Sequence, residues 1–167
     1  MTSETRQDRV DVARAEAFLA TIGAARPVAV GQALPPLAHL AFFWDIVDEA
    51  GLGHDGHPRL GGLIPDLGLP VRMWGGGRLI WHQPFAAAIQ AERVSTVTGI
   101  QRKDGRSGKL AFVTVRHEIK QARKPVLSED QTLVYREAGA LGEPPVEAGE
   151  ADERRALKVS AMTLFRY

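Results

Sequence analysis

The second half of the chain carries the pattern that most restricts the fold: a series of apolar strands joined by short turns. Four segments are rich in the β-branched and aromatic residues that favour strands. They are residues 78–85, 90–101, 109–119 and 126–136. Between the second and third segments, Asp104-Gly105 supplies the positive backbone angles of a hairpin turn. These features predict a meander of antiparallel strands.

The segment 109–119 is the clearest strand in the sequence. Apolar residues stand at both odd and even positions, so we expect both faces of this strand to be covered. One face carries Leu110, Phe112 and Thr114, and the other carries Ala111, Val113, Val115 and Ile119.

The first half of the chain predicts less regular structure. Apolar residues at helical spacing predict an amphipathic helix over residues 8–22, ending near Gly23. Two prolines close the segment 27–36, which we therefore expect to be an edge or a loop. The apolar run 37–50 is long enough for a buried helix, although its periodicity does not separate helix from strand. A loop rich in glycine and proline follows over residues 51–70. The prediction is an α+β fold in which the strands pack on one apolar helix.

Composition excludes several classes of protein. A length of 167 residues suits one compact domain. The absence of cysteine excludes disulfides, thiolate metal sites and cysteine nucleophiles. Because 21 basic residues face 20 acidic ones, the chain lacks the basic excess of a nucleic-acid-binding protein. The polar start and the lack of a long apolar run argue against a signal peptide and a membrane span, so we expect the cytoplasm.

Six stretches, in their order and spacing over residues 28–136, carry a resemblance to a known family. They are Val30-Gly31-Gln32-Ala33-Leu34-Pro35-Pro36, Gly56-His57-Pro58-Arg59-Leu60-Gly61-Gly62, Arg72-Met73-Trp74-Gly75-Gly76-Gly77-Arg78-Leu79, Gly105-Arg106-Ser107-Gly108, Phe112-Val113-Thr114-Val115-Arg116-His117-Glu118 and Asp130-Gln131-Thr132-Leu133-Val134-Tyr135-Arg136. The chain resembles the amino-terminal domain of MaoC-like dehydratases, specifically the two-hotdog hydratases acting on itaconyl-, mesaconyl- and related 2-enoyl-CoA esters. The resemblance implies a single hotdog fold, an antiparallel sheet wrapped round a central helix.

The resemblance also implies a domain organisation. We assign residues 1–24 to an N-terminal helix and tail, 25–137 to the hotdog domain, 138–156 to a linker and 157–167 to the start of a second hotdog. Leu164-Phe165-Arg166-Tyr167 resembles the first strand of that second hotdog. In the family the hydratase motif, an Asn or Asp followed by His and a further acidic residue, comes after this stretch. No residue here corresponds to it, so we expect a non-catalytic half with no catalytic residue of its own.

Other candidate chemistry in the chain is weaker. His117 stands on a predicted strand between two charged residues, so we interpret it as structural rather than catalytic. His54 and His57, beside Asp55, suggest a metal, but without a third ligand at regular spacing we expect no metal site. A competing enzyme class is the hotdog thioesterases, which place a carboxylate on the central helix.

Asp45, Asp48 and Glu49 are the candidates for such a carboxylate, and we interpret them instead as the solvated end of the apolar run.

The expected function is therefore binding of an acyl-CoA or acyl carrier protein thioester, without a cofactor. Glycines allow a backbone to approach a ligand, and Met and Trp provide adaptable apolar surface. The candidates for the wall of the acyl pocket are Arg59, Gly61, Gly62, Met73, Trp74, Gly75 and Gly76. The alternative, that these residues only cap the core and turn the chain, stays open. The expected partner is a separate catalytic hotdog or a second copy of this chain; a homodimer would act as a thioesterase or as a silent binding module.

Overall fold

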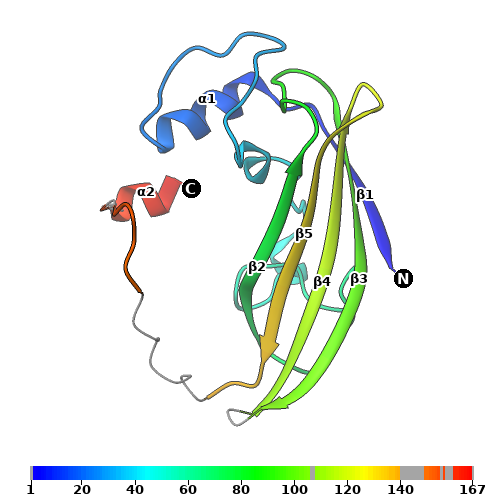
Figure 1. Cartoon of the computed structure of the whole chain (residues 1–167). Helices are drawn as coiled ribbons and strands as arrows, with labels where there is room; N and C mark the ends of the chain where they lie inside the picture. Colours follow the sequence, from blue (N-terminus) through cyan, green and yellow to red (C-terminus); the bar gives the residue numbers. More distant parts are fainter. Residues whose placement is uncertain (1, 106–107, 140–148, 155, 157–159, 167) are drawn as a thin grey trace.

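The chain folds into one five-stranded antiparallel sheet with short helices beside it (Figure 1). The computed structural model describes residues 2–105, 108–139, 149–154, 156 and 160–166, and only the backbone of 164–166. The strands are β1 Ser3–Asp8, β2 Val71–Trp81, β3 Ala91–Gly105, β4 Gly108–Gln121 and β5 Lys124–Arg136, in the spatial order β1-β3-β4-β5-β2. The helices are α1 Val12–Thr21, the 3₁₀ turns η1 Ala38–Ala41 and η2 Glu49–Gly51, and α2 Ala161–Arg166. The predicted α+β class is confirmed.

The predicted meander is present as β3, β4 and β5, whereas β2 pairs with β5 at the other side of the sheet and not with β3, its neighbour in sequence. All four predicted segments are strands. The first of these strands begins at Val71 rather than at residue 78 and carries a bulge between Trp74 and Gly76. On β4 the odd-numbered apolar residues are buried, whereas Leu110 and Phe112 on the other face are only half-buried. Only one face of the sheet is therefore fully covered, and the expectation that both faces of this strand are covered was wrong.

The amino terminus contributes both a strand and a helix. The helix predicted over 8–22 is α1, whose N-cap residue Asp11 accepts a hydrogen bond from the backbone of Arg14 at 3.0 Å. Residues 3–8, interpreted from the sequence as a tail, form β1 and pair with β3. Their polar composition hid the strand, because an edge strand buries few of its side chains.

The apolar run 37–50 is neither a long helix nor a strand. Only Ala38–Ala41 is helical there, as a 3₁₀ turn, and two residues break the run with left-handed backbone angles, Leu37 at φ 69° and Phe43 at φ 59°. Phe43 packs in the core beside Phe85, with ring centroids 6.5 Å apart. Ala38, Phe42 and Phe43 of this run are buried in the core. The other large apolar residues of the run are exposed: Leu37, Leu40, Trp44, Ile46 and Val47.

The predicted linker and second hotdog are only partly visible. Residues 140–148, 155, 157–159 and 167, together with the hairpin residues 106–107, lie outside the described residues. The expected strand at the chain's end is a helix, because Ala161–Arg166 form α2. Within the described residues, no helix is long and apolar enough to cross a membrane.

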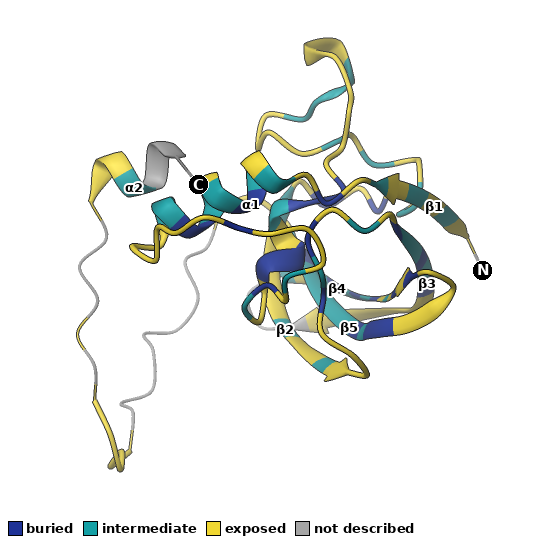
Figure 2. Cartoon of the chain, turned by 90° about the horizontal axis from the view of Figure 1, so that it is seen from above, coloured by how far each residue is buried: buried dark blue, intermediate teal, exposed yellow. Residues whose placement is uncertain are grey.

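The sheet curves, and its inner side holds the core. Figure 2, which looks along the strands, shows the sheet bent into an arc with α1 beside it. Two apolar clusters occupy the inner side, one under α1 and η1 and one at the far end of the strands. The first includes Val10, Leu19, Phe42, Phe43, Phe85, Ile119, Val126 and Leu127, and the second includes Leu67, Leu69, Val97, Ala111, Val113, Val115 and Tyr135.

Candidate functional site

A row of polar side chains crosses the inner face of the sheet between the two apolar clusters. Glu4 of β1 lies opposite Ser95 of β3, Ser95 lies opposite His117 of β4, and His117 lies opposite Glu129 of β5. Directly opposed residues of antiparallel strands present their side chains on the same face. The strand register therefore places four polar groups side by side where an uninterrupted core would be apolar.

A cavity of about 560 Å³ opens over this row. All five strands contribute to its wall, together with η1 and the loop before β2. Its polar lining residues are Glu4, Arg6, His39, Asp45, His57, Arg59, Arg72, Arg93, His117, Glu129 and Gln131. Its apolar lining includes Leu40, Leu60, Leu63, Ile64, Met73, Trp74, Val115, Ile119 and Leu133. This mixture is typical of pockets that hold an apolar chain bearing a few polar groups.

His117 is held at both ring nitrogens. Its Nδ1 lies 2.8 Å from the hydroxyl of the fully buried Ser95, and its Nε2 lies 3.4 Å from Oε1 of Gln131. Burial, together with the nearby positive charge of Arg93, lowers the pKa of His117 below its ordinary value. The imidazole is therefore neutral at pH 7.

Glu129 pairs with a histidine from a distant part of the chain. Its Oε2 lies 3.4 Å from Nε2 of His39 on η1, and both side chains are buried. Burial alone would raise the pKa of Glu129, but the hydrogen bond from His39 and the charge of Arg93 act in the opposite direction, and the net effect lowers that pKa. Glu129 is therefore an ionised carboxylate inside the cavity.

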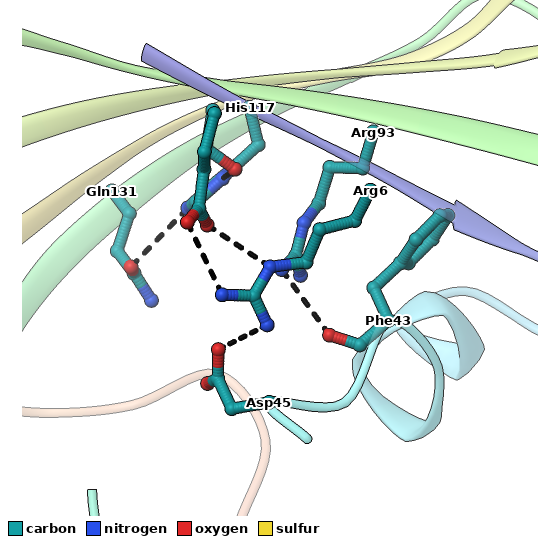
Figure 3. Close-up of polar contacts among 8 residues, drawn as sticks. Arg6, Phe43, Asp45, Arg93, His117 and Gln131 are labelled. Atoms are coloured by element: carbon teal, nitrogen blue, oxygen red, sulfur yellow. Dashed lines mark hydrogen bonds and ion pairs between the residues drawn. The ribbon is translucent and has the colours of Figure 1, made fainter. Parts of the chain in front are cut away.

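Two arginines complete the polar lining and are drawn in Figure 3. Arg6 and Arg93 are opposite one another in the β1–β3 pair. Arg6 forms ion pairs with Glu4, at 3.1 Å, and with Asp45. Arg93 instead donates to the carbonyl oxygen of Phe43 at 3.3 Å. Burial and the neighbouring charge of Arg6 lower the pKa of Arg93.

The chemical capacity of the row is mainly that of a binding site. It contains a neutral imidazole and a carboxylate, the two types of group that hydration of a double bond requires. Both, however, are engaged by neighbouring protein groups: His117 by Ser95 and Gln131, and Glu129 by His39. Such internal satisfaction holds the side chains rigid and favours a recognition role.

The structure brings together only part of the predicted acyl-pocket wall. Arg59, Gly62, Met73 and Trp74 line the cavity, whereas Gly61, Gly75 and Gly76 are not among its lining residues. A Cβ on Gly75 would lie 2.7 Å from Cγ2 of Val134, so this glycine allows β2 to pack on β5. A binding role for the wall residues stays a prediction.

Of the three candidate carboxylates of a thioesterase, Asp45 lines the cavity and Asp48 and Glu49 do not. Asp45 pairs with Arg6. Asp48 caps η2 by accepting a hydrogen bond from the backbone of Gly51 at 3.0 Å, and Glu49 is exposed in that turn. His57 also lines the cavity. In the described part of the chain, no group of three His, Asp or Glu side chains is arranged to hold a metal ion.

Sequence reasoning missed most of the polar row. His117 was interpreted as structural, although it shares the parity of the buried residues Val115 and Ile119 on β4. A polar residue among the positions of a strand that face the core was the available signal. Glu129 gives the same signal, because it lies two residues after the buried Leu127 on β5. Arg6 and His39 had no such signal, because only the tertiary fold brings them to the sheet.

Comparisons with known proteins agree with this architecture. Residues 37–167 match the family model described as hydroxyacyl-thioester dehydratase type 2. The chain is 39% identical over 139 residues to a mesaconyl-C(4)-CoA hydratase of Chloroflexus aurantiacus, a match that covers 81% of this chain and 50% of that protein. The chain thus spans about half the length of this curated relative.

Solved structures show the same fold at low sequence identity. HtdX of Mycobacterium tuberculosis superposes with a TM-score of 0.57 at 13% identity, covering 100% of this chain and 61% of that one. A chain of the ChsH1-ChsH2 complex from Mycobacterium tuberculosis gives a TM-score of 0.55 at 14% identity, covering 87% of this chain and 90% of that one. These two likenesses concern the fold alone.

Proposed function

Because the chain belongs to the hydroxyacyl-thioester dehydratase type 2 family and has a hotdog fold, we propose that it is the acyl-pocket-forming half of a 2-enoyl thioester hydratase. It binds the acyl part of an acyl-CoA or acyl carrier protein thioester. A second, catalytic hotdog supplies the acid–base pair that adds water to the double bond or removes it.

The exposed edge strand β2 is the observation that carries this proposal. Trp74 lines the cavity and is nevertheless 67% exposed, and its neighbour Met73 is 44% exposed. Ile80 and Trp81 continue the exposed apolar surface along the same strand. Among the described strands, β2 pairs only with β5, so its outer edge is open. A long apolar edge of this kind is normally covered by another protein element.

A protein packed on β2 would at the same time complete the cavity. Trp74 contributes to both surfaces, so a subunit that covers this tryptophan also closes the wall beside it. The partner that fits is a second hotdog, either a separate catalytic subunit or a second copy of this chain. The match to this chain covers 50% of the relative, which supports the two-hotdog arrangement.

The relative also supports the proposed substrate class. That protein is a mesaconyl-C(4)-CoA hydratase, and the cavity here offers the mixed apolar and polar lining that a short branched acyl group requires. The catalytic role is assigned to the partner because His117 and Glu129 are held by their protein neighbours.

Hydration assays test the proposal. The chain is purified alone and with a co-expressed catalytic hotdog, and hydration of crotonyl-, mesaconyl- and itaconyl-CoA is followed by loss of the enoyl thioester. We expect no turnover by the chain alone and turnover by the mixture.

Turnover by the chain alone would overturn the assignment of the catalytic groups. The specific alternative is the buried His39–Glu129 pair. If the lone chain is active and His39→Ala abolishes that activity, the acid–base pair lies in this chain. Hydrolysis of the thioester, rather than hydration, would instead support a hotdog thioesterase.

A further inference from the structure

Arg93 differs from the other charged groups of the cavity that are shielded from solvent in having no counter-ion. In the described part of the chain it forms no ion pair. Its guanidinium donates to the carbonyl oxygen of Phe43 at 3.3 Å and lies 5.0 Å from the centre of the Phe43 ring. Its Nε is buried and has no hydrogen-bond acceptor. A cation inside the protein is therefore held by one carbonyl and one ring.

The positive charge of Arg6 makes the position of the Arg93 guanidinium energetically less favourable. Arg6 is directly opposite Arg93 in the sheet, and like charges at such a pair destabilise it. Arg6 forms ion pairs with Glu4 and with Asp45, and Figure 3 shows the pair with Asp45. The same carboxylates act on Arg93 only at longer range, and burial with the charge of Arg6 lowers its pKa.

The carboxylates of the cavity are already paired. Glu4 and Asp45 bind Arg6, and Glu129 binds His39. Arg72 lies 3.8 Å from Asp55. Arg59 also lines the cavity without an ion pair, but it is exposed to solvent and donates to the carbonyl oxygen of Leu52. Among the described lining residues, Arg93 is thus the shielded cation without a counter-ion, and an anion entering the cavity could bind there. Buried arginines of this type bind carboxylates through charge-assisted hydrogen bonds.

We propose that Arg93 binds a carboxylate at the distal end of the acyl group, so that the preferred substrate is the monothioester of a dicarboxylic acid. This inference rests on the proposed function, because it requires that the acyl group occupies this cavity. Arg93 would select among acyl groups, and the chemistry of hydration does not involve it.

Two thioesters that differ only at the distal group test the inference. In mesaconyl-C4-CoA a carboxylate occupies the position that a methyl group occupies in 3-methylcrotonyl-CoA. Titration calorimetry with the purified chain should show binding of mesaconyl-C4-CoA that is about ten- to one-hundredfold tighter, the range expected for one hydrogen bond to a charged group.

The variant Arg93→Met removes the charge and keeps the length of the side chain. It should abolish the preference for mesaconyl-C4-CoA and leave the affinity for 3-methylcrotonyl-CoA unchanged. Arg93→Lys should retain part of the preference. The matched control is Arg116→Met, on the same sheet. Arg116 is exposed, forms an ion pair with Asp130 at 2.7 Å and does not line the cavity. This control should keep the wild-type preference.

Stability separates recognition from a structural role. A buried cation without a counter-ion destabilises the empty chain, and apolar replacements of such groups are often stabilising. Arg93→Met should therefore melt at the same temperature as the wild-type chain or higher when no ligand is present. A lower melting temperature would assign Arg93 a structural role and overturn the inference.

The binding results also distinguish the inference from the proposed function. Equal binding of the two thioesters by the wild-type chain, or an equal loss of both in Arg93→Met, would overturn the carboxylate site and leave the acyl-binding function intact. Binding of neither thioester would overturn the proposed function and the inference with it.

Discussion

Glu129→Gln is the most informative single change in the polar row, because it removes a buried charge without changing the shape of the side chain. Glu129 pairs with His39 at 3.4 Å, and the side chains are 9% and 6% exposed. Glutamine can still accept the hydrogen bond from His39. The substitution therefore measures the charge alone.

The magnitude follows from the difference between charged and neutral hydrogen bonds. A bond to a charged group contributes about 1.5–3 kcal/mol and a neutral one about 0.5–1.5 kcal/mol. We expect Glu129→Gln to lower the free energy of unfolding by about 1–2 kcal/mol at pH 7. For a chain of this length that loss corresponds to a fall in melting temperature of roughly 2–8 °C.

The loss should depend on pH with a defined sign. The folded-state pKa of Glu129 lies below its ordinary value of 4.5, so the unfolded chain takes up the proton first as the pH falls. The stabilisation is complete above about pH 4.5 and disappears as the pH falls through the lower folded-state pKa. The stabilities of the variant and the wild-type chain should therefore converge in acid.

His117 adds a second loss of stability at higher pH. Its folded-state pKa lies below its ordinary value of 6.5, so its contribution is complete above that pH and falls as the solution becomes more acidic. The charge of Glu129 acts to raise the pKa of His117, so the difference between the wild-type and Glu129→Gln chains includes this coupling as well as the pairing of Glu129 with His39.

Urea unfolding followed by tryptophan fluorescence at several pH values measures these quantities. The control is Asp130→Asn, one residue along β5, because Asp130 points to the opposite face and pairs with the exposed Arg116. It should change stability little. Equal stability of Glu129→Gln and wild-type chains at pH 7, or a difference that grows in acid, would refute the account of the polar row.

Three further changes test the packing of β2 against β5, the hydrogen bonds of Gln121 to the loop before β3, and the exposed edge strand β2. Gly75→Ala should lower the free energy of unfolding by about 1–3 kcal/mol, because the new Cβ would lie 2.7 Å from Val134, whereas Gly62→Ala, with no atom within 4 Å, should have little effect in urea unfolding. Gln121→Leu should cost about 2–4 kcal/mol in the same assay, because the amide holds three backbone groups of the loop before β3 at 2.8–2.9 Å; a stable variant would show that these bonds are dispensable. Trp74→Ser should leave the melting temperature of the single chain unchanged, since Trp74 is 67% exposed, and should weaken association with the second hotdog by about 2 kcal/mol in sedimentation experiments. Unchanged association would place the interface elsewhere.

Much of the sheet could be predicted because its signals are local. The strands β3, β4 and β5 follow from their β-branched and aromatic residues. Asp104 and Gly105, expected to supply the turn, are instead the last paired residues of β3, and residues 106–107 between the two strands lie outside the described residues. The helix α1 follows from apolar spacing and its cap at Asp11. Strand β1 could not be predicted, because a polar edge strand is specified by its partner rather than by its own composition.

The candidate site was less predictable than the fold. The loop residues Arg59 and Gly62 and the β2 residues Met73 and Trp74 were expected at an acyl pocket, and they line the cavity. The polar centre was missed because its members are far apart in sequence. His39 and Glu129, for example, are separated by 90 residues.

The sequence by itself therefore determined the antiparallel meander of β3, β4 and β5 and the division of the β4 residues between two faces, because alternation along a strand is a property of the backbone. Only the tertiary structure decided which polar residues meet. The pairing of β1 with β3 sets Arg6 beside Arg93, and the path of the apolar loop brings His39 to Glu129. These positions depend on how the core is filled, and many segments contribute to that at once.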